Sequence, residues 1–366
     1  MSLNWTNTTE RKPLATLKAL SSALVLTTLA VAGTASAAPL DGGRIGYVMT
    51  ERHWAVYGTD DAKQECPKGF NTGPREQYDE RFPDNSDETL TEEETRLMLE
   101  GRRFHLTTEE EPFPFYEVEG PVSYGLNLDG KVDANDFRNP AGVEGVDNEL
   151  YRAVGCIAIY RPPDGTFYHF DNLFMIGNAY NRWMIELTGV DSLENDDEVT
   201  VTFYRGLDDL VTDAAGTGFV SGGTQRVDAR WGKSFIQEVQ GEIVDGVLMT
   251  DPVDKAKFPW SFPGIGGGYH IMRDFRLSLN VSEKEAKGVL GGYVDVEHFS
   301  HRLNRNWTTH HHSYGQLSAP SLYRAMKRLA DAHPDPETGE NTAISSAVDV
   351  TLTQVYIVHP KEMVSN

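Results

Sequence analysis

The chain has 366 residues, of which 39% are hydrophobic and 24% charged, a balance typical of a globular protein with a substantial core. Its 55 acidic residues outnumber its 33 lysines and arginines, which gives a formal net charge of −22. Nucleic acid and anionic membranes repel a surface of the same sign, so both are excluded as expected partners, whereas cationic and neutral partners stay open.

The first 37 residues have the pattern of a secretory signal peptide. Arg11, Lys12 and Lys18 precede an uncharged, mostly apolar stretch, and Ala35-Ser36-Ala37 supplies the small residues of a cleavage site. Because the apolar stretch is shorter than the roughly 20 residues of a membrane span, we expect cleavage near Ala37. The mature protein is then periplasmic or secreted and has no membrane span. Residues 1–37 carry a net charge of +2, so their loss leaves −24.

Two cysteines, Cys66 and Cys156, follow the cleavage site. Export to an oxidising compartment favours a disulfide between them, and two buried free thiols are the alternative. The sequence contains neither CxxC nor CxxCH, so it gives no support to thioredoxin-like chemistry or covalent haem attachment.

Where the mature chain shows periodicity, the period is mostly two, which predicts strands with one dry and one wet face. A helix over about 91–102, opened by a Thr91/Glu94 capping box, is the first expected element. Strands follow at 199–204, at 235–249 around an Asp245-Gly246 hairpin turn, and at 276–297 as a second hairpin. A helix over 321–332 and a strand over 348–357 complete the chain.

Few helices, many short strands, 34 glycines and 18 prolines together predict a mainly β fold. We expect an antiparallel β-sandwich, jelly-roll-like, with a few peripheral helices. Residues 38–180 form an N-terminal part and residues 181–366 the sandwich part in this interpretation, either as separate units or as one continuous domain.

Residues 125–137 carry the most specific local motif. Oxygen-bearing side chains occupy alternate positions around Gly130, as a hard cation with six or more ligands requires. Over this stretch alone, the sequence resembles the calcium loop of dockerin modules and EF-hands. The resemblance implies a buried hydrophobe at Val132 and a structural Ca²⁺ held by Asn127, Asp129, the carbonyl oxygen of Lys131, Asp133 and Asp136.

The loop departs from the family at its first position, where Gly125 replaces an aspartate. Asp147 and Glu149 are candidates to supply the missing ligand from outside the loop. The second dockerin repeat is absent, so cohesin binding does not follow. The alternative is a metal-free turn, because Asp, Asn and Gly populate turns for local reasons.

Catalytic candidates are Asp295 and Glu297, which are expected to share the wet face of a strand, with His298 next in the chain. Residues 293–299 are similar to the acid-bearing strand of laminarinase-like glycoside hydrolases, whose Glu-x-Asp-x-Glu pattern implies a nucleophile, a helper and an acid/base. Tyr293 replaces the first Glu here. An ordinary solvated strand face is the alternative.

Histidines and tryptophans are the remaining candidates. His298, His301 and the run 310–312 form either a metal-binding group or a polar loop. The tryptophans at 54, 183, 231, 260 and 307 either stack on sugar rings or pack in the interior.

The sequence therefore predicts an exported, calcium-stabilised, β-rich binding or structural protein of the cell envelope. Its expected ligand is a glycan or another small molecule, with carbohydrate the first class to test. The alternative is a secreted hydrolase, which would use either the Asp295/Glu297 pair or a histidine-bound metal.

Overall fold

The computed structural model describes residues 42–71, 96–99, 102–105, 115–161, 165–177, 182–216, 218–260, 268–304 and 319–360. Contacts divide the chain after Ala37 into two units, and the second unit, 38–366, contains all of these residues. The expected signal peptide, residues 1–37, lies outside the described residues.

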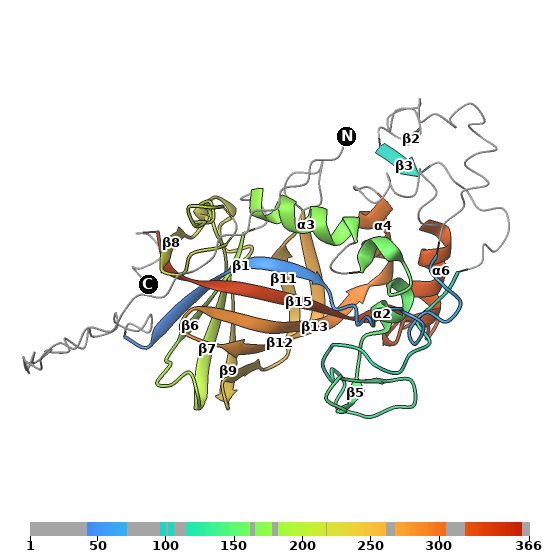
Figure 1. Cartoon of the computed structure of the whole chain (residues 1–366), viewed down its shortest axis with the longest axis horizontal. Coiled ribbons are helices and arrows are strands. Elements are labelled where there is room, and N and C mark those ends of the chain that lie inside the picture. Colours follow the sequence, from blue (N-terminus) through green and yellow to red (C-terminus); the bar gives the residue numbers. More distant parts are fainter. Residues whose placement is uncertain are drawn as a thin grey trace, which may run out of the picture. The chain divides into compact units, whose positions relative to one another are not determined.

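Eight antiparallel strands close into a barrel (Figure 1). In order around the barrel they are β1 (Arg44–Trp54), β6 (Trp183–Thr188), β7 (Asp196–Arg205), β9 (Gln237–Val244), β10 (Val247–Thr250), β12 (Tyr269–Val281), β13 (Glu285–Asp295) and β15 (Asn341–Val358), which pairs with β1 again. The prediction of a β-sandwich is therefore wrong, although the mainly β class and the few helices are correct.

The error has a physical cause. Strands with one dry and one wet face have the same alternating sequence pattern in a sandwich of two packed sheets and in a barrel formed by one closed sheet. The difference lies in the pairing of β1 with β15, in which Gly46 faces Val355. The backbones approach so closely there that a Cβ on Gly46 would lie 2.7 Å from the carbonyl oxygen of Val355.

The other elements lie outside the eight-strand path. Additional strands are β2 (Arg96–Leu99), β3 (Arg102–His105), β4 (Phe137–Arg138), β5 (Glu144–Val146), β8 (Gly223–Arg226), β11 (Val253–Pro259) and β14 (Ala332–Pro334). The helices are α2 (Glu149–Val154), α3 (Thr166–Gly177), α4 (Val296–Asn304) and α6 (Ala319–Leu329), with 3-10 turns η2 (Ala158–Tyr160) and η4 (Ala229–Trp231). Among the described residues, no helix combines the length and apolar character that crossing a membrane requires.

The predictions of single turns and elements were more accurate than the prediction of a β-sandwich. The β9–β10 hairpin turns at Asp245-Gly246, both with positive φ (+50° and +79°), as the sequence predicted. The hairpin of β12 and β13 and the helix α6 are also confirmed. The helix expected over 91–102 is wrong in its described part, because β2 and β3 pair there as antiparallel strands.

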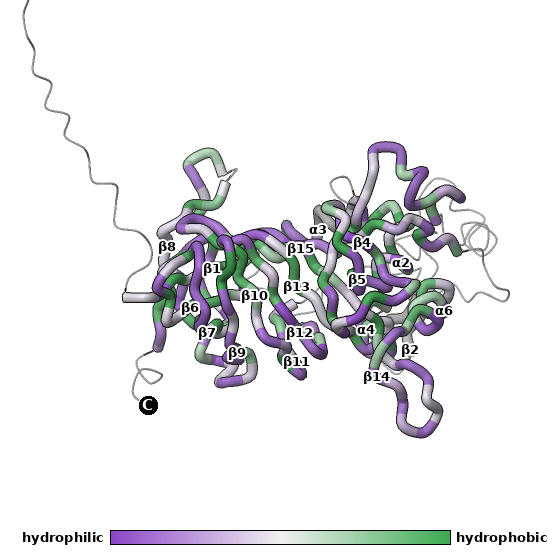
Figure 2. The backbone as a smooth tube through the Cα atoms, turned by 90° about the horizontal axis from the view of Figure 1, so that it is seen from below, coloured by the Kyte–Doolittle hydropathy of each residue, from purple (hydrophilic) through white to green (hydrophobic). Residues whose placement is uncertain are grey.

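Buried apolar side chains fill the barrel interior, and along β12 and the middle of β15 they alternate with less buried ones. Figure 2 shows hydrophobic and hydrophilic positions interspersed along the strands. Trp183 and Phe203 pack with ring centroids 5.3 Å apart, and Phe203 contacts Phe275 at 5.7 Å. Trp54 and Trp260 stack at 5.0 Å, and both are buried. Three of the five tryptophan candidates therefore pack in the interior, and Trp307 lies outside the described residues.

A buried ion pair fixes α3 to the barrel. Arg52 of β1 binds both carboxylate oxygens of Asp171 in α3, with Nε 2.9 Å from Oδ2. The Trp260 indole donates to the same carboxylate at 3.2 Å, and the Arg52 guanidinium lies 3.9 Å from the Trp260 ring centroid. Loss of either charge would leave the other buried without its partner, which is costly.

The predicted disulfide is confirmed. Cys66 and Cys156 are bonded, with Cα atoms 5.7 Å apart. The bond joins the segment that follows β1 to the turn that follows α2, and both sulfur atoms are buried.

We predict that the double substitution Cys66→Ala with Cys156→Ala lowers the free energy of unfolding by about 2–4 kcal/mol. The bridge closes a loop with a sequence separation of 90, and such cross-links stabilise mainly by restricting the unfolded chain. Urea denaturation measures the loss, and reduced wild-type protein should show the same loss. Equal midpoints for the variant and the oxidised wild type would contradict the prediction.

Candidate functional site

The segment 115–154 packs against the outer face of β12, β13 and β15. Arg276 of β12 anchors it by donating to the carbonyl oxygens of Asn127 and Leu128, each at 2.8 Å. Leu128 is buried with Tyr293 of β13 and Ala343 of β15. This contact places the predicted calcium loop beside the barrel wall.

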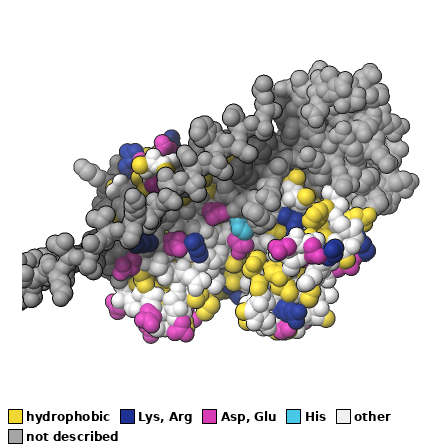
Figure 3. Space-filling view, in the orientation of Figure 1, with side chains coloured by type: hydrophobic (Ala, Val, Ile, Leu, Met, Phe, Trp, Pro, Cys, Tyr) yellow, Lys and Arg dark blue, Asp and Glu magenta, His cyan; other side chains and the backbone are white. Residues whose placement is uncertain are grey.

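A cavity of about 760 Å³ lies between this segment, the barrel wall and the chain that follows α6. Seven carboxylates line it, against three cationic side chains, together with Tyr293 and His333. The carboxylates are Asp129, Asp133, Asp136, Asp147, Glu149, Asp274 and Asp331, and the cations are Lys131, Arg152 and Arg328. We call this cavity the acidic cleft. Acidic side chains also occur elsewhere on the described surface (Figure 3), but in the cleft they face a common space.

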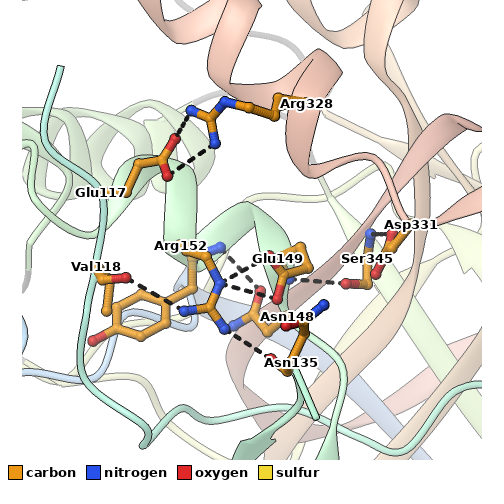
Figure 4. A network of polar contacts seen from close by, with 10 residues as sticks. Glu117, Val118, Asn135, Asn148, Glu149, Arg152, Arg328, Asp331 and Ser345 are labelled. Carbon is orange, nitrogen blue, oxygen red and sulfur yellow. Dashed lines mark hydrogen bonds and ion pairs between the residues drawn. The ribbon is translucent and has the colours of Figure 1, made fainter. Parts of the chain in front are cut away.

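A network of polar contacts at the cleft joins Glu149 and Arg152 of α2 to Ser345 of β15 and to Asp331 (Figure 4). The Ser345 amide donates to Asp331 at 2.8 Å, and its hydroxyl oxygen accepts from the Glu149 amide at 2.8 Å. The Glu149 carboxylate accepts from Nε of Arg152 at 2.9 Å, and Arg152 also donates to the carbonyl oxygen of Asn135 at 2.8 Å. The network therefore holds two of the seven acids in place before any ligand arrives.

Three of the acids bind protons more tightly than usual. Burial raises the pKa of Asp147 to about 6, against the opposing effect of the amide of Leu128, which donates to its carboxylate at 2.6 Å. Burial likewise raises the pKa of Asp331 to about 6 and shifts the pKa of Glu149 upward. These carboxylates lose favourable hydration in the cleft, so a proton or another cation that neutralises them is stabilising.

The side chains of Asp274 and His333 lie in contact in the cleft, and both residues have an unusual backbone conformation. Both are non-glycine residues with positive φ, +48° and +54°, and His333 Nε2 lies 3.1 Å from Asp274 Oδ2. Asp274 lies in an irregular stretch of β12 where the pairing register with β13 shifts. Tyr293 packs edge-on to His333 at 5.6 Å and is 6% exposed. Strained backbones and bulges of this kind recur at functional sites, where the surrounding structure maintains them.

The predicted calcium loop contributes Asp129, Lys131, Asp133 and Asp136 to the cleft, whereas Asn127 does not line it. Its polar groups bond within the loop: Asn127 accepts from the Gly130 amide at 2.7 Å, and its own amide donates to the Lys131 carbonyl oxygen at 2.6 Å. The Lys131 ammonium lies 3.0 Å from Asp129. The loop is thus closed by its own hydrogen bonds.

Two details bear on calcium. Val132 is 65% exposed, so the expectation that it is the buried hydrophobe is wrong, and Leu128 has that place instead. Asp147 does reach the loop from outside, through its hydrogen bond to Leu128. Within the described ranges, no three His, Cys, Asp or Glu side chains converge closely enough to hold a metal ion. The calcium site stays a prediction.

Asp295 and Glu297 do not share a strand face, so that prediction is wrong. β13 ends at Asp295, and α4 begins with the next residue. Asp295 accepts the His298 amide at 2.8 Å, as an N-cap residue does, and pairs with Arg273 at 3.4 Å. Glu297 lies on α4 and accepts the hydroxyl of Tyr323.

The histidine group is only partly described. His298 lies on α4, where its ring stacks on Tyr269 at 6.3 Å and burial lowers its pKa. His301 lies one turn further along the same helix. The run 310–312 lies outside the described residues.

Four residues of the cleft, Asp274, Tyr293, Asp331 and His333, were missed as functional candidates by sequence reasoning. They come from β12, β13 and the chain around β14, and no motif joins them. Comparison of the chain with protein-family models, curated proteins and solved structures found no match. Function is therefore argued from the chemistry of the cleft.

We predict that Asp147→Asn stabilises the calcium-free protein at pH 7.5 by about 1–2 kcal/mol after allowance for solvent screening, with the gain vanishing near pH 4. The pKa of this carboxyl is raised to about 6 in the folded protein, so the folded state binds more protons between its ordinary pKa and 6. Wild-type stability consequently falls as the pH rises through that window.

Urea denaturation at pH 4, 5, 6 and 7.5 measures this effect. Asp254→Asn, which removes an exposed carboxylate from β11, is the matched control and should leave the pH profile unchanged. A profile for Asp147→Asn that parallels the wild type at every pH would contradict the prediction.

Proposed function

We propose that the protein is an exported, calcium-stabilised binding protein of the cell envelope and that the acidic cleft binds the cation. The observation that carries this proposal is the gathering of seven carboxylates against three cationic side chains around one cavity. Calcium prefers oxygen ligands, and carboxylates are the strongest of those that proteins offer. The excess negative charge in the cleft favours a cation over an anionic ligand.

Calcium binding requires the loop to exchange its internal bonds for metal ligands. The ion pair of Asp129 with the Lys131 ammonium would break, and so would the hydrogen bond from the Asn127 side-chain amide to the Lys131 carbonyl oxygen. Asp147 is half-buried and directed at the loop. It would supply the carboxylate that calcium loops have at their first position, where this chain has Gly125. Because a proton on this carboxyl competes with the metal, its raised pKa supports a cation site of moderate affinity.

Two features support export. Residues 1–37 have the charge and apolar pattern of a signal peptide. The Cys66–Cys156 disulfide suits an oxidising compartment, either the periplasm or the exterior.

We predict that millimolar calcium raises the melting temperature of the wild-type protein by several degrees relative to EDTA, because a ligand that binds the folded state alone stabilises it. Asp147→Asn and Asp136→Asn should each lose most of this shift, whereas Asp254→Asn should keep it. Differential scanning calorimetry at pH 7.5 measures the shift, and magnesium at equal concentration tests ion selectivity. Superimposable wild-type curves in calcium and EDTA would refute the proposed site.

An exported hydrolase is the second candidate function, favoured by the contact of His333 Nε2 with Asp274 Oδ2 at 3.1 Å beside the buried Tyr293. A histidine oriented by a carboxylate is the usual arrangement of a general base. The residues proposed for this role replace Asp295 and Glu297, which the fold separates onto a strand end and a helix.

Release of nitrophenol from a panel of nitrophenyl glycosides and esters tests the hydrolase. Turnover by wild-type protein should fall at least about a hundredfold in His333→Asn and stay unchanged in Asp254→Asn. Equal turnover in His333→Asn and the wild type would exclude this dyad, and absence of turnover on the whole panel would leave binding as the function.

A further inference from the structure

A second cavity, of about 920 Å³, lies on the outer face of β1 and β15. The lining residues that carry the argument are His53, Phe70, Tyr124, Arg161 and Asp349, and no lining residue is shared with the acidic cleft. We call it the aromatic pocket. Its size suits a ligand of one or two sugar rings.

The disulfide holds the two walls of the aromatic pocket together. One wall is the segment 56–70, which contains Cys66, and the other is formed by Ala158, Arg161 and Gly165, which follow Cys156 in the chain. Arg161 joins the walls a second time, because it pairs with Glu65 at 3.5 Å and donates to the Gly155 carbonyl oxygen at 2.7 Å. The pocket is thus formed in the free protein, which lowers the entropic cost of binding.

Two aromatic rings keep exposed surface at the pocket. Phe70 is 39% exposed and Tyr124 is 38% exposed. Tyr124 is held edge-on against Tyr57 at 5.7 Å, and the Arg161 guanidinium lies 5.4 Å from the Phe70 ring centroid. Partly exposed aromatic rings offer an apolar face to a ligand that carries both apolar and polar groups.

The polar groups of the pocket are largely paired with one another. His53 and Asp349 face each other across the β1–β15 pairing, with Nδ1 3.7 Å from Oδ2. Glu65, which accepts the Thr59 hydroxyl at 2.9 Å, balances Arg161. A charged ligand would disturb these pairs, whereas hydroxyl groups can donate to Asp349 and to the His53 ring, whose Nδ1 lies 3.0 Å from the Trp54 carbonyl oxygen, without a change in net charge.

We propose that the aromatic pocket binds a neutral saccharide, with one sugar ring against Tyr124 and its hydroxyl groups hydrogen-bonded to Asp349 and His53. This assignment rests on the proposed binding function and adds the ligand class and a place for it apart from the cation. The disulfide then has a functional consequence, because it fixes the width of the saccharide site.

Isothermal titration calorimetry tests the assignment with glucose, galactose, N-acetylglucosamine and their β-linked disaccharides cellobiose, lactose and chitobiose. At least one of these sugars should bind saturably to the wild-type protein. Tyr124→Ala and Asp349→Asn should each weaken that binding at least tenfold. Tyr356→Ala, which removes an exposed tyrosine elsewhere on β15, is the matched control and should bind like the wild type.

Circular dichroism and the melting temperature establish that each variant is folded, and Tyr124→Phe, which keeps the ring, should retain affinity. Absence of binding to all six sugars overturns the proposal, as does binding that survives both Tyr124→Ala and Asp349→Asn. The titrations are repeated in calcium and in EDTA. A calcium-dependent melting shift without sugar binding refutes the saccharide site alone, and sugar binding without that shift refutes the calcium site alone.

Discussion

The pairing of β1 with β15 is the constraint on which the rest of the structure depends. It joins strands about 300 residues apart and converts a curled sheet into a barrel without free edges along the ring. β15 pairs without interruption with β13 from Ala343 to Thr353. Because Ser345 and Asp349 both lie on the outer face of this one strand, closure also sets the positions of the acidic cleft and the aromatic pocket relative to each other.

Asn148 holds the outer segment on this strand between the two cavities. Its side-chain oxygen accepts from the Ala347 amide at 3.2 Å and from the first turn of α2, and its amide donates to the carbonyl oxygen of Ala55 at 3.1 Å. It also donates to the Tyr124 carbonyl oxygen at 2.9 Å. One buried side chain thus connects both walls of the barrel seam with the segment that carries Tyr124 on one side and Glu149 on the other. Buried networks of this kind rigidify a structure only when every member is satisfied, as here.

Sequence reasoning succeeded where the determinants are local. The Asp245-Gly246 turn follows from the backbone preferences of two residues, and the disulfide follows from two cysteines in a chain that the sequence predicts to be exported. It failed where the structure depends on contacts between segments that are far apart in the chain. Closure of the barrel depends on β1 meeting β15, and the strand expected to continue past Asp295 turns into a helix because Asp295 caps it. Asp274 and His333 become neighbours through the register shift of β12 and the left-handed conformation of His333 within β14, which no periodicity reveals.

Part of the negative charge that gives the chain its net charge of −22 is concentrated in the acidic cleft. Asp147 and Asp331 lose hydration there, and each holds its proton to a pH of about 6. Above that pH the same carboxylates are ionised at a free-energy cost that a bound divalent cation offsets. If the cleft binds calcium as proposed, protons and calcium compete for one set of oxygens, and calcium affinity falls as the pH drops below 6. The aromatic pocket is lined by two carboxylates, Asp60 and Asp349, beside the cation Arg161, so it lacks the concentration of negative charge found in the cleft. The saccharide proposed for it would bind through hydroxyl groups and ring faces, whereas the cation proposed for the cleft would bind through carboxylates.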